Sequence, residues 1–254
     1  MSQALQRILV TGSTSGIGLA TARRLVDAGV AVVITGRTRR TVEAARGILA
    51  QSADVPVDGI VADLHEASGT ALLTRELEER YPSLDVVLSH GGPQVPEIFA
   101  TSDPGGFEAI AEALFLTNAR LAHALLPLLR EAPEGGRLVV VTSDAARYPT
   151  TGEVMIGALA AASVMFVRTF AREVARDGVR ANVVTVTLTQ DTLTHDRVLG
   201  ASDFSRRLFE KAEARMPLGP VRADDVAATI VHLLPAGAAT MTGQVVGVTG
   251  GLST

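Results

Sequence analysis

The sequence of 254 residues contains no cysteine, one lysine and two tyrosines. The absence of cysteine excludes disulfides, thiolate metal ligands and cysteine nucleophiles. The lysine is Lys211, and the tyrosines are Tyr81 and Tyr148. Because Asp85 and Gly152 stand four residues after the tyrosines, the chain has no tyrosine followed four residues later by a lysine.

Positive charge and long hydrophobic runs are also scarce. The chain has 23 basic and 27 acidic residues, a net charge of −4, which gives no electrostatic reason to expect nucleic acid or an anionic membrane as a partner. No run approaches the ~18 apolar residues of a membrane span, and the N-terminus lacks the basic and apolar regions of a signal peptide. We therefore expect a soluble, cytoplasmic protein that binds neither nucleic acid nor membrane.

The apolar residues alternate between short β-branched runs and longer segments of helical period, a pattern typical of βαβ units. Runs so uniformly apolar indicate strands covered by helices on both faces. The sequence therefore predicts an α/β fold, a doubly wound parallel seven-stranded sheet of the Rossmann type, in a single domain over residues 1–254. The expected strands are 8–11, 31–35, 57–62, 86–89, 137–142, 181–186 and 244–248. The expected helices are 18–28, 40–51, 67–80, 107–130, 157–176 and 224–234.

One long segment, 187–217, has no strand pattern but carries charge and modest helical periodicity. In a doubly wound sheet the ligand crevice lies at the C-terminal ends of the strands. We expect this segment to form a lid over that crevice.

A glycine-rich turn joins the first expected strand to the first expected helix. Its key residues are Gly12, Ser15, Gly16, Ile17 and Gly18. Glycines let the backbone approach a pyrophosphate closely, and a helix N-terminus offers free N–H groups and a positive dipole end. An ordinary tight turn is the alternative, but the preceding strand and following helix favour dinucleotide binding.

The end of the second expected strand indicates which dinucleotide is bound. A site for NAD usually has a carboxylate there for the ribose 2′-hydroxyl, whereas a 2′-phosphate calls for arginine. This chain has Gly36 and Arg37, and a guanidinium is a planar, bidentate phosphate donor. A solvated basic patch is the alternative for Arg39 and Arg40. We expect Arg37 to select NADP(H).

Further motifs follow in a fixed order along the chain. Asp63-Leu64 follows the third expected strand, Gly91-Gly92 follows the fourth, and Asn182 lies in the sixth. With the Thr-Gly-x-x-x-Gly-Ile-Gly spacing from Thr11, they make the chain resemble the short-chain dehydrogenase/reductase family over nearly its whole length. The resemblance implies a carbonyl or alcohol oxidoreductase in which Asp63 and Leu64 hold the adenine and Gly91 lies beside the nicotinamide.

The same resemblance identifies positions for the catalytic residues. It places the family's catalytic serine at Ser143, its tyrosine at Ile156 and its lysine at Ala160. The register of the enoyl-reductase branch instead places the tyrosine at Glu153 and again the lysine at Ala160. Neither register supplies the tyrosine or the lysine.

Other departures from the family pattern cluster at the nicotinamide end. The family's structural asparagine falls at Leu114, and Asn118 lies one helical turn later. The Pro-Gly that flanks the nicotinamide is replaced by Val186-Thr187. The pyrophosphate and adenosine motifs show no such changes.

Three residues are candidates for catalysis at this end. Ser143 is placed to hydrogen-bond a substrate oxygen, with a strand-end serine satisfying local backbone as the alternative. Tyr148 and His90 are candidate proton donors; a loop tyrosine with a packed ring, and a histidine bonded to nucleotide or backbone, are the alternatives. We expect three further groups near the crevice to be solvated: Glu153, Asp191 and His195. No histidine spacing indicates a metal site.

Two functional hypotheses follow. The first is an NADP(H)-dependent oxidoreductase that acts on a small molecule, with a non-standard source of the proton. The second is a catalytically silent relative that binds nucleotide or serves as a partner subunit. The small, apolar start of helix 157–176 lies where family members pack against a second subunit, so the resemblance implies a homo-oligomer, a dimer or tetramer.

Overall fold

A parallel sheet of seven strands forms the centre of the computed structural model, which describes residues 7–52, 54–89, 91–234 and 238–253. The strand order is β3-β2-β1-β4-β5-β6-β7, so the predicted doubly wound sheet is confirmed. The order reverses between β1 and β4, which is where such folds place their ligand crevice. The strands are β1 (Arg7–Val10), β2 (Ala31–Gly36), β3 (Val57–Val61), β4 (Asp85–Leu88), β5 (Arg137–Ser143), β6 (Arg180–Val186) and β7 (Val245–Val248).

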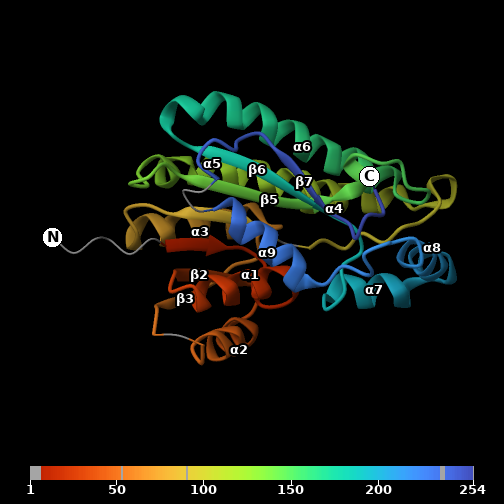
Figure 1. Cartoon of the computed structure of the whole chain (residues 1–254), viewed down its shortest axis with the longest axis horizontal. Helices are drawn as coiled ribbons and strands as arrows, with labels where there is room; N and C mark the ends of the chain where they lie inside the picture. The colour runs from red at the N-terminus through yellow and green to blue at the C-terminus, as the bar shows by residue number, and fades with distance from the viewer. Residues whose placement is uncertain (1–6, 53, 90, 235–237, 254) are drawn as a thin grey trace.

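Helices cover both faces of the sheet (Figure 1). One face carries α1 (Gly16–Asp27), α2 (Arg39–Leu49) and α9 (Ala223–Leu233), and the other carries α3 (Ala67–Arg80), α5 (Thr117–Arg130) and α6 (Val154–Val174). Alternate strand residues supply the two cores, because successive side chains of a strand point to opposite faces. Leu9 belongs to the core beneath α3, α5 and α6, whereas its neighbours Ile8 and Val10 belong to the core beneath α1, α2 and α9.

The expected helix 107–130 is interrupted in the structure. It consists of α4 (Phe107–Ala111), a π-helical turn η3 (Glu112–Leu116) and α5. A π turn frees backbone groups from the regular pattern, and here the Leu114 carbonyl accepts hydrogen bonds from Asn118 Nδ2, at 3.1 Å, and from Ser163 Oγ. The hydrogen bond from Ser163 joins the π turn to α6, a contact that the helical period of the sequence alone does not reveal. The short 3₁₀ turns are η1 (Phe99–Thr101), η2 (Pro104–Gly106), η4 (Asp144–Ala146) and η5 (Ala175–Asp177).

The C-terminal ends of the strands meet at one edge of the sheet. Parallel pairing aligns Val10 with Val87 and Leu88 with Val140, so the turns after β1, β4 and β5 lie together. The segment 187–217, expected as a lid, contains α7 (Leu193–Ala201) and α8 (Asp203–Glu213), and both lie at this edge (Figure 1).

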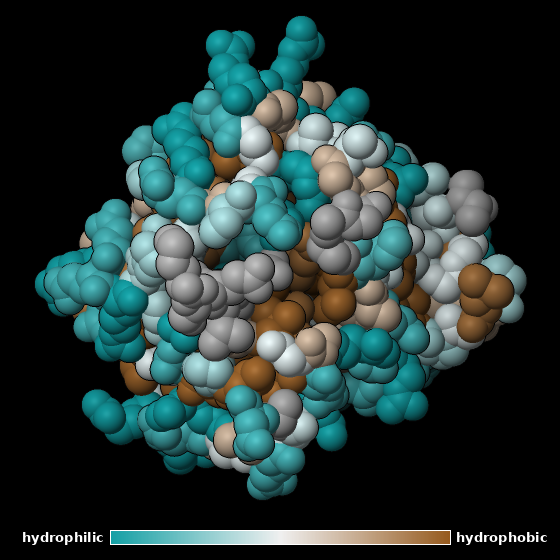
Figure 2. Space-filling model, turned by 60° about the vertical axis from the view of Figure 1, so that its left-hand side comes forward, coloured by the Kyte–Doolittle hydropathy of each residue, from teal (hydrophilic) through white to brown (hydrophobic). Residues whose placement is uncertain are grey.

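Two helical stretches, Pro104–Arg130 and Val154–Asp177, are long and apolar enough to cross a membrane by length and composition. Both belong to the layer that packs on β4, β5 and β6, and a helix on a buried sheet needs an apolar face of the same kind. Figure 2 shows one side of the molecule, where hydrophilic residues surround a smaller hydrophobic area.

Candidate functional site

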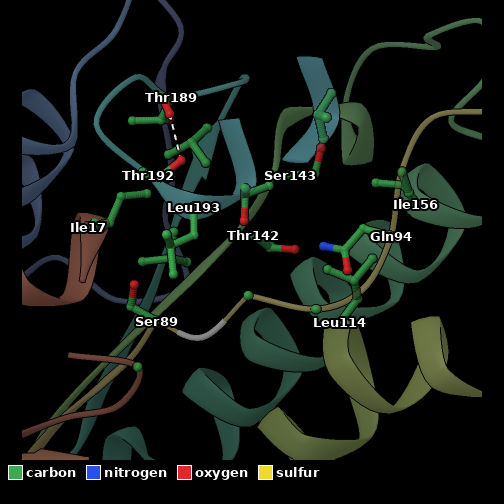
Figure 3. A pocket seen from close by; sticks show the side chains of 18 of the residues that line it. Ile17, Ser89, Gln94, Leu114, Thr142, Ser143, Ile156, Thr189, Thr192 and Leu193 are labelled. Carbon is green, nitrogen blue, oxygen red and sulfur yellow. Dashed lines mark hydrogen bonds between the residues drawn. The ribbon is translucent and has the colours of Figure 1, made fainter. Parts of the chain in front are cut away.

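A cavity of about 750 Å³ opens at the C-terminal edge of the sheet. The residues that follow β1, β2, β3, β4, β5 and β6 line it, and α7 and α8 close one side. Side chains from these separate elements lie around a common space (Figure 3). On the lid side, Thr192 Oγ1 donates to the Thr189 carbonyl at 2.8 Å and fixes the turn that leads into α7.

The glycine-rich turn forms one wall of the cavity. All five residues predicted to hold the pyrophosphate line it: Gly12, Ser15, Gly16, Ile17 and Gly18. Gly12 and Gly16 have φ of 59° and 53°, a conformation that favours glycine. A Cβ on Gly18 would lie 2.5 Å from the Gly12 carbonyl oxygen. The start of α1 therefore lies so close to the turn that only glycine fits at this position.

The end expected to bind adenosine lies beside this turn. Arg37 is exposed and lines the cavity, as do Asp63 and Leu64. A Cβ on Gly36 would lie 2.5 Å from the Thr14 methyl group, so a side chain with a carboxylate does not fit there without a shift. The charged side chain next to Gly36 is therefore that of Arg37.

The opposite end of the cavity contains the strand end of β5. Ser143 lines it, and its Oγ accepts a hydrogen bond from the Ala145 N–H at 3.2 Å. A hydroxyl that accepts from backbone keeps its own proton to donate. Two neighbouring polar atoms, Thr142 Oγ1 and Gln94 Oε1, are buried and have no hydrogen-bond partner among the described residues.

Hydrocarbon side chains occupy positions where the resemblance expects polar ones. Ile156, at the tyrosine position, is 6% exposed and lines the cavity, facing the same space as Ser143 and Gln94 (Figure 3). Leu114, at the asparagine position, also lines it, whereas Asn118 is buried outside the lining. Ala160 is fully buried and does not reach the cavity.

Glu153 lines the cavity and is half-buried, so the expectation that it is a solvated surface group is wrong. Burial raises the pKa of the Glu153 carboxyl to about 7, and the negative charge of Asp144 acts in the same direction, while a hydrogen bond with Thr150 opposes both. The ring of Phe204 in α8 covers the adjacent Gly152, where a Cβ would meet the ring at 2.6 Å. The lid helix α8 therefore packs on the turn that carries the half-buried Glu153.

The other candidates for catalysis are placed differently. Tyr148 is not among the residues that line the cavity, and its ring centre lies 5.3 Å from the Arg147 guanidinium. His90 lies outside the described residues. Asp191 is exposed and pairs with Arg222 at 2.9 Å, as expected of a solvated group. The His195 side chain is only 17% exposed, so the expectation that it is solvated is wrong. The catalytic roles of Ser143, Tyr148 and His90 stay predictions.

Some cavity residues carry no signal in the sequence. Gln94 reaches the cavity because Gly92 makes room for it, since a Cβ on Gly92 would lie 2.3 Å from Gln94 Oε1. Leu208 and Phe209 of α8 complete the apolar side. Within the described ranges, no cluster of three histidine, aspartate or glutamate side chains is arranged to hold a metal ion.

Comparison with known proteins identifies the family to which this chain belongs. A family model described as enoyl-(acyl carrier protein) reductase matches residues 12–253. The chain belongs to the short-chain dehydrogenase/reductase family. The sheet order, the glycine turn and the crevice at the strand ends are the scaffold of this family of oxidoreductases.

Several members of the family illustrate the range of likeness. A short chain dehydrogenase of Aspergillus nomiae is 35% identical over 59% of this chain, and the match covers 42% of that protein, less than half its length. The structure of the actinorhodin polyketide ketoreductase with NADPH is 26% identical, with a TM-score of 0.88 and 97% of each chain covered. The structure of L-sorbose reductase from Gluconobacter frateurii, complexed with NADPH and L-sorbose, is 25% identical, with a TM-score of 0.85 over 99% of this chain and 98% of that one.

The raised pKa of Glu153 predicts how the free energy of unfolding of this protein depends on pH. An unfolded glutamate has a pKa of about 4.3, so between that pH and about 7 the folded protein binds the proton more tightly than the unfolded chain does. The free energy of unfolding therefore falls as pH rises through this window. We expect Glu153→Gln to abolish this fall, which amounts to about 4 kcal/mol over the whole window.

Urea unfolding at a series of pH values measures this effect. Glu78→Gln, on the exposed side of α3, is the matched control and should leave the pH dependence of the native protein unchanged. An identical pH dependence in the native protein and Glu153→Gln would show that the Glu153 carboxyl titrates as an ordinary one.

Proposed function

We propose that this chain is an NADP(H)-dependent reductase of small carbonyl compounds, which also oxidises the corresponding alcohols. The observation that carries the proposal is the continuity of the cavity. One space joins the glycine turn and Arg37 to Ser143 and Glu153, so a nucleotide held at one end extends toward a substrate oxygen at the other.

The residues present fit a dinucleotide. The backbone of Gly12 to Gly18 would hold the pyrophosphate, since a side chain at Gly18 would fill the space of the turn itself. Arg37 would pair with the 2′-phosphate, Asp63 and Leu64 would hold the adenine, and Gly91 would border the nicotinamide. When bound, the nicotinamide supplies or accepts the hydride.

The protein's own part is to orient the substrate oxygen and exchange a proton with it. Carbonyl reduction requires an acid within reach as the hydride arrives. Ile156 cannot supply a proton, and Ala160 supplies no cation to tune one, so the proton follows a non-standard route. The Ser143 hydroxyl, free to donate, would hydrogen-bond the substrate oxygen and stabilise the charge that develops on it.

A catalytically silent nucleotide-binding subunit is the second candidate function. The observation in its favour is that Ile156 and Leu114 line the cavity with hydrocarbon where the family has a tyrosine and an asparagine. The reductase is preferred because Ser143 and Glu153 retain polar chemistry in the same space.

We also propose that the chain assembles as a homodimer or homotetramer in the cytoplasm. Large apolar side chains point outward from the helical layer formed by η3 and α6: Leu116 is 42% exposed and Met165 is 58% exposed. A second copy of the same layer would remove these side chains from water, which favours association.

Binding of the nucleotide tests the first part of the proposal. Arg37→Ala removes the planar donor expected for the 2′-phosphate, and a charge-assisted hydrogen bond of this kind contributes about 1.5–3 kcal/mol. We expect the dissociation constant for NADPH to rise by about 10- to 100-fold and that for NADH to change little. Nicotinamide fluorescence measures both, since the chain has no tryptophan to interfere.

Arg39→Ala is the matched control, because Arg39 is equally exposed and does not line the cavity. It should leave both affinities unchanged. Equal losses for NADPH and NADH in Arg37→Ala would contradict recognition of the 2′-phosphate, and absence of binding by the native protein would contradict the proposed function.

The role of Ser143 is tested by turnover. Loss of a donor to a developing oxyanion typically lowers kcat by about 10²- to 10³-fold. We expect Ser143→Ala to lower kcat for reduction of diacetyl by NADPH by this order while the affinity for NADPH stays the same. Ser68→Ala, on the exposed start of α3, is the control. An unchanged kcat in Ser143→Ala would remove Ser143 from the site.

A further inference from the structure

We propose that Glu153 is the acid–base residue of this site, giving a proton to the substrate oxygen during reduction and taking it back during oxidation. The proposal rests on the reductase function proposed above and names the group that replaces tyrosine. Its basis is position. Glu153 lines the same cavity as Ser143 and Ile156, at the end away from Arg37.

The backbone places Glu153 next to the strand end that carries Ser143. Glu153 is the N-cap residue of α6, but its side chain makes no capping hydrogen bond, so the carboxyl is not committed to the helix. A Cβ on Gly157 would lie 2.9 Å from the Ala145 carbonyl oxygen. The first turn of α6 therefore packs directly on the residues that follow Ser143.

The lid supplies the apolar surroundings. Gly152 has φ of 88° and packs against the ring of Phe204, which places α8 over the turn that carries Glu153. The Gly152 carbonyl also accepts a hydrogen bond from the Glu97 N–H, at 2.9 Å. Glu153 is thus held between the loop after β4, the segment after β5 and the lid.

The charged groups around this space do not neutralise Glu153. The one whose charge acts on it is Asp144, which accepts from Thr185 at 3.0 Å and lies 3.8 Å from Arg147. The other charged side chains of this end have partners of their own. Glu112 is bound by Arg120 and Thr117, and Arg197 donates to the Gly92 carbonyl at 2.6 Å. Among the described residues, no cation forms a salt bridge with Glu153.

A carboxyl in this environment has the proton affinity that the reaction needs. With its pKa raised to about 7 by burial, Glu153 is protonated in a large fraction of molecules at neutral pH, and an acid is most effective when its pKa lies near the working pH. As the hydride forms the new C–H bond and the carbonyl π bond breaks, the carboxyl O–H bond breaks and the alcohol O–H bond forms. The carboxylate that remains takes a proton from water before the next turnover.

The pH dependence of kcat tests this role. The full-length protein is assayed with NADPH and two electrophilic probes, diacetyl and phenanthrenequinone. Reduction requires the protonated acid, so kcat of the native protein should fall as pH rises through about 7. Glu153→Gln should lower kcat by about 10²-fold or more and remove this pH dependence, with the dissociation constant for NADPH changed less than about twofold.

Two variants accompany Glu153→Gln. Glu153→Asp keeps a carboxyl group at a shifted position. Its kcat should depend on pH and lie between the values for the native protein and Glu153→Gln. If Glu153→Gln does not fold, Glu153→Asp is used for the test instead. Phe204→Ala removes the ring over Gly152 and should move the midpoint of the kcat profile to lower pH. Glu97→Gln, an exposed neighbouring carboxylate, should leave kcat and its profile unchanged.

The outcomes separate this inference from the function on which it rests. If Glu153→Gln keeps both the native kcat and the native pH profile, Glu153 is not the acid, and the reductase function stands. If the native protein binds NADPH and reduces neither probe nor any other carbonyl compound, both are overturned.

Discussion

Parallel pairing of β1, β4, β5 and β6 is the constraint on which the rest of the structure depends. It places the glycine-rich turn after β1, the loop that carries Gln94 and the end of β5 with Ser143 at one edge of the sheet. Helices on both faces bury the central strands β1, β2 and β4 almost completely, so this edge is where backbone N–H groups and polar side chains meet solvent or ligand. The cavity forms because α7 and α8 return across it.

The two ends of the cavity are built on different principles. The nucleotide end consists mainly of backbone, and the close approach of Gly18 to the Gly12 carbonyl leaves no room for other residue types. The reacting end consists of side chains, and there hydrocarbon groups such as Ile156 surround a few polar atoms. Such surroundings strengthen the interactions of any polar group that remains. A fold shared with many oxidoreductases thus leaves the chemistry to be decided by a few side chains.

Features set by local pattern could be predicted from the sequence, and features set by long-range packing could not. The sheet, the glycine turn and the position of Arg37 follow from short stretches whose residue types determine their conformation. Strand limits differ from expectation by at most one residue at each end, since the pattern that predicts a strand is weakest where the strand ends. The π turn at Glu112–Leu116 is hydrogen-bonded to Ser163 in another helix, a contact between segments far apart in the chain. The turn that carries Glu153 packs through Gly152 on Phe204, which lies 51 residues beyond Glu153 in the chain. The local sequence around Glu153 does not reveal this contact, so the sequence alone predicts a solvated carboxylate there.

The central claim is that this cavity brings a nicotinamide and a carbonyl group together for hydride transfer. The most direct measurement uses NADPH deuterated at the transferable position, incubated with the native protein and diacetyl, with mass spectrometry of the product. The account predicts an alcohol that carries one deuterium on the former carbonyl carbon, formed only when the protein is present. Tight binding of the nucleotide with no deuterium transferred to this or any other carbonyl compound would contradict it.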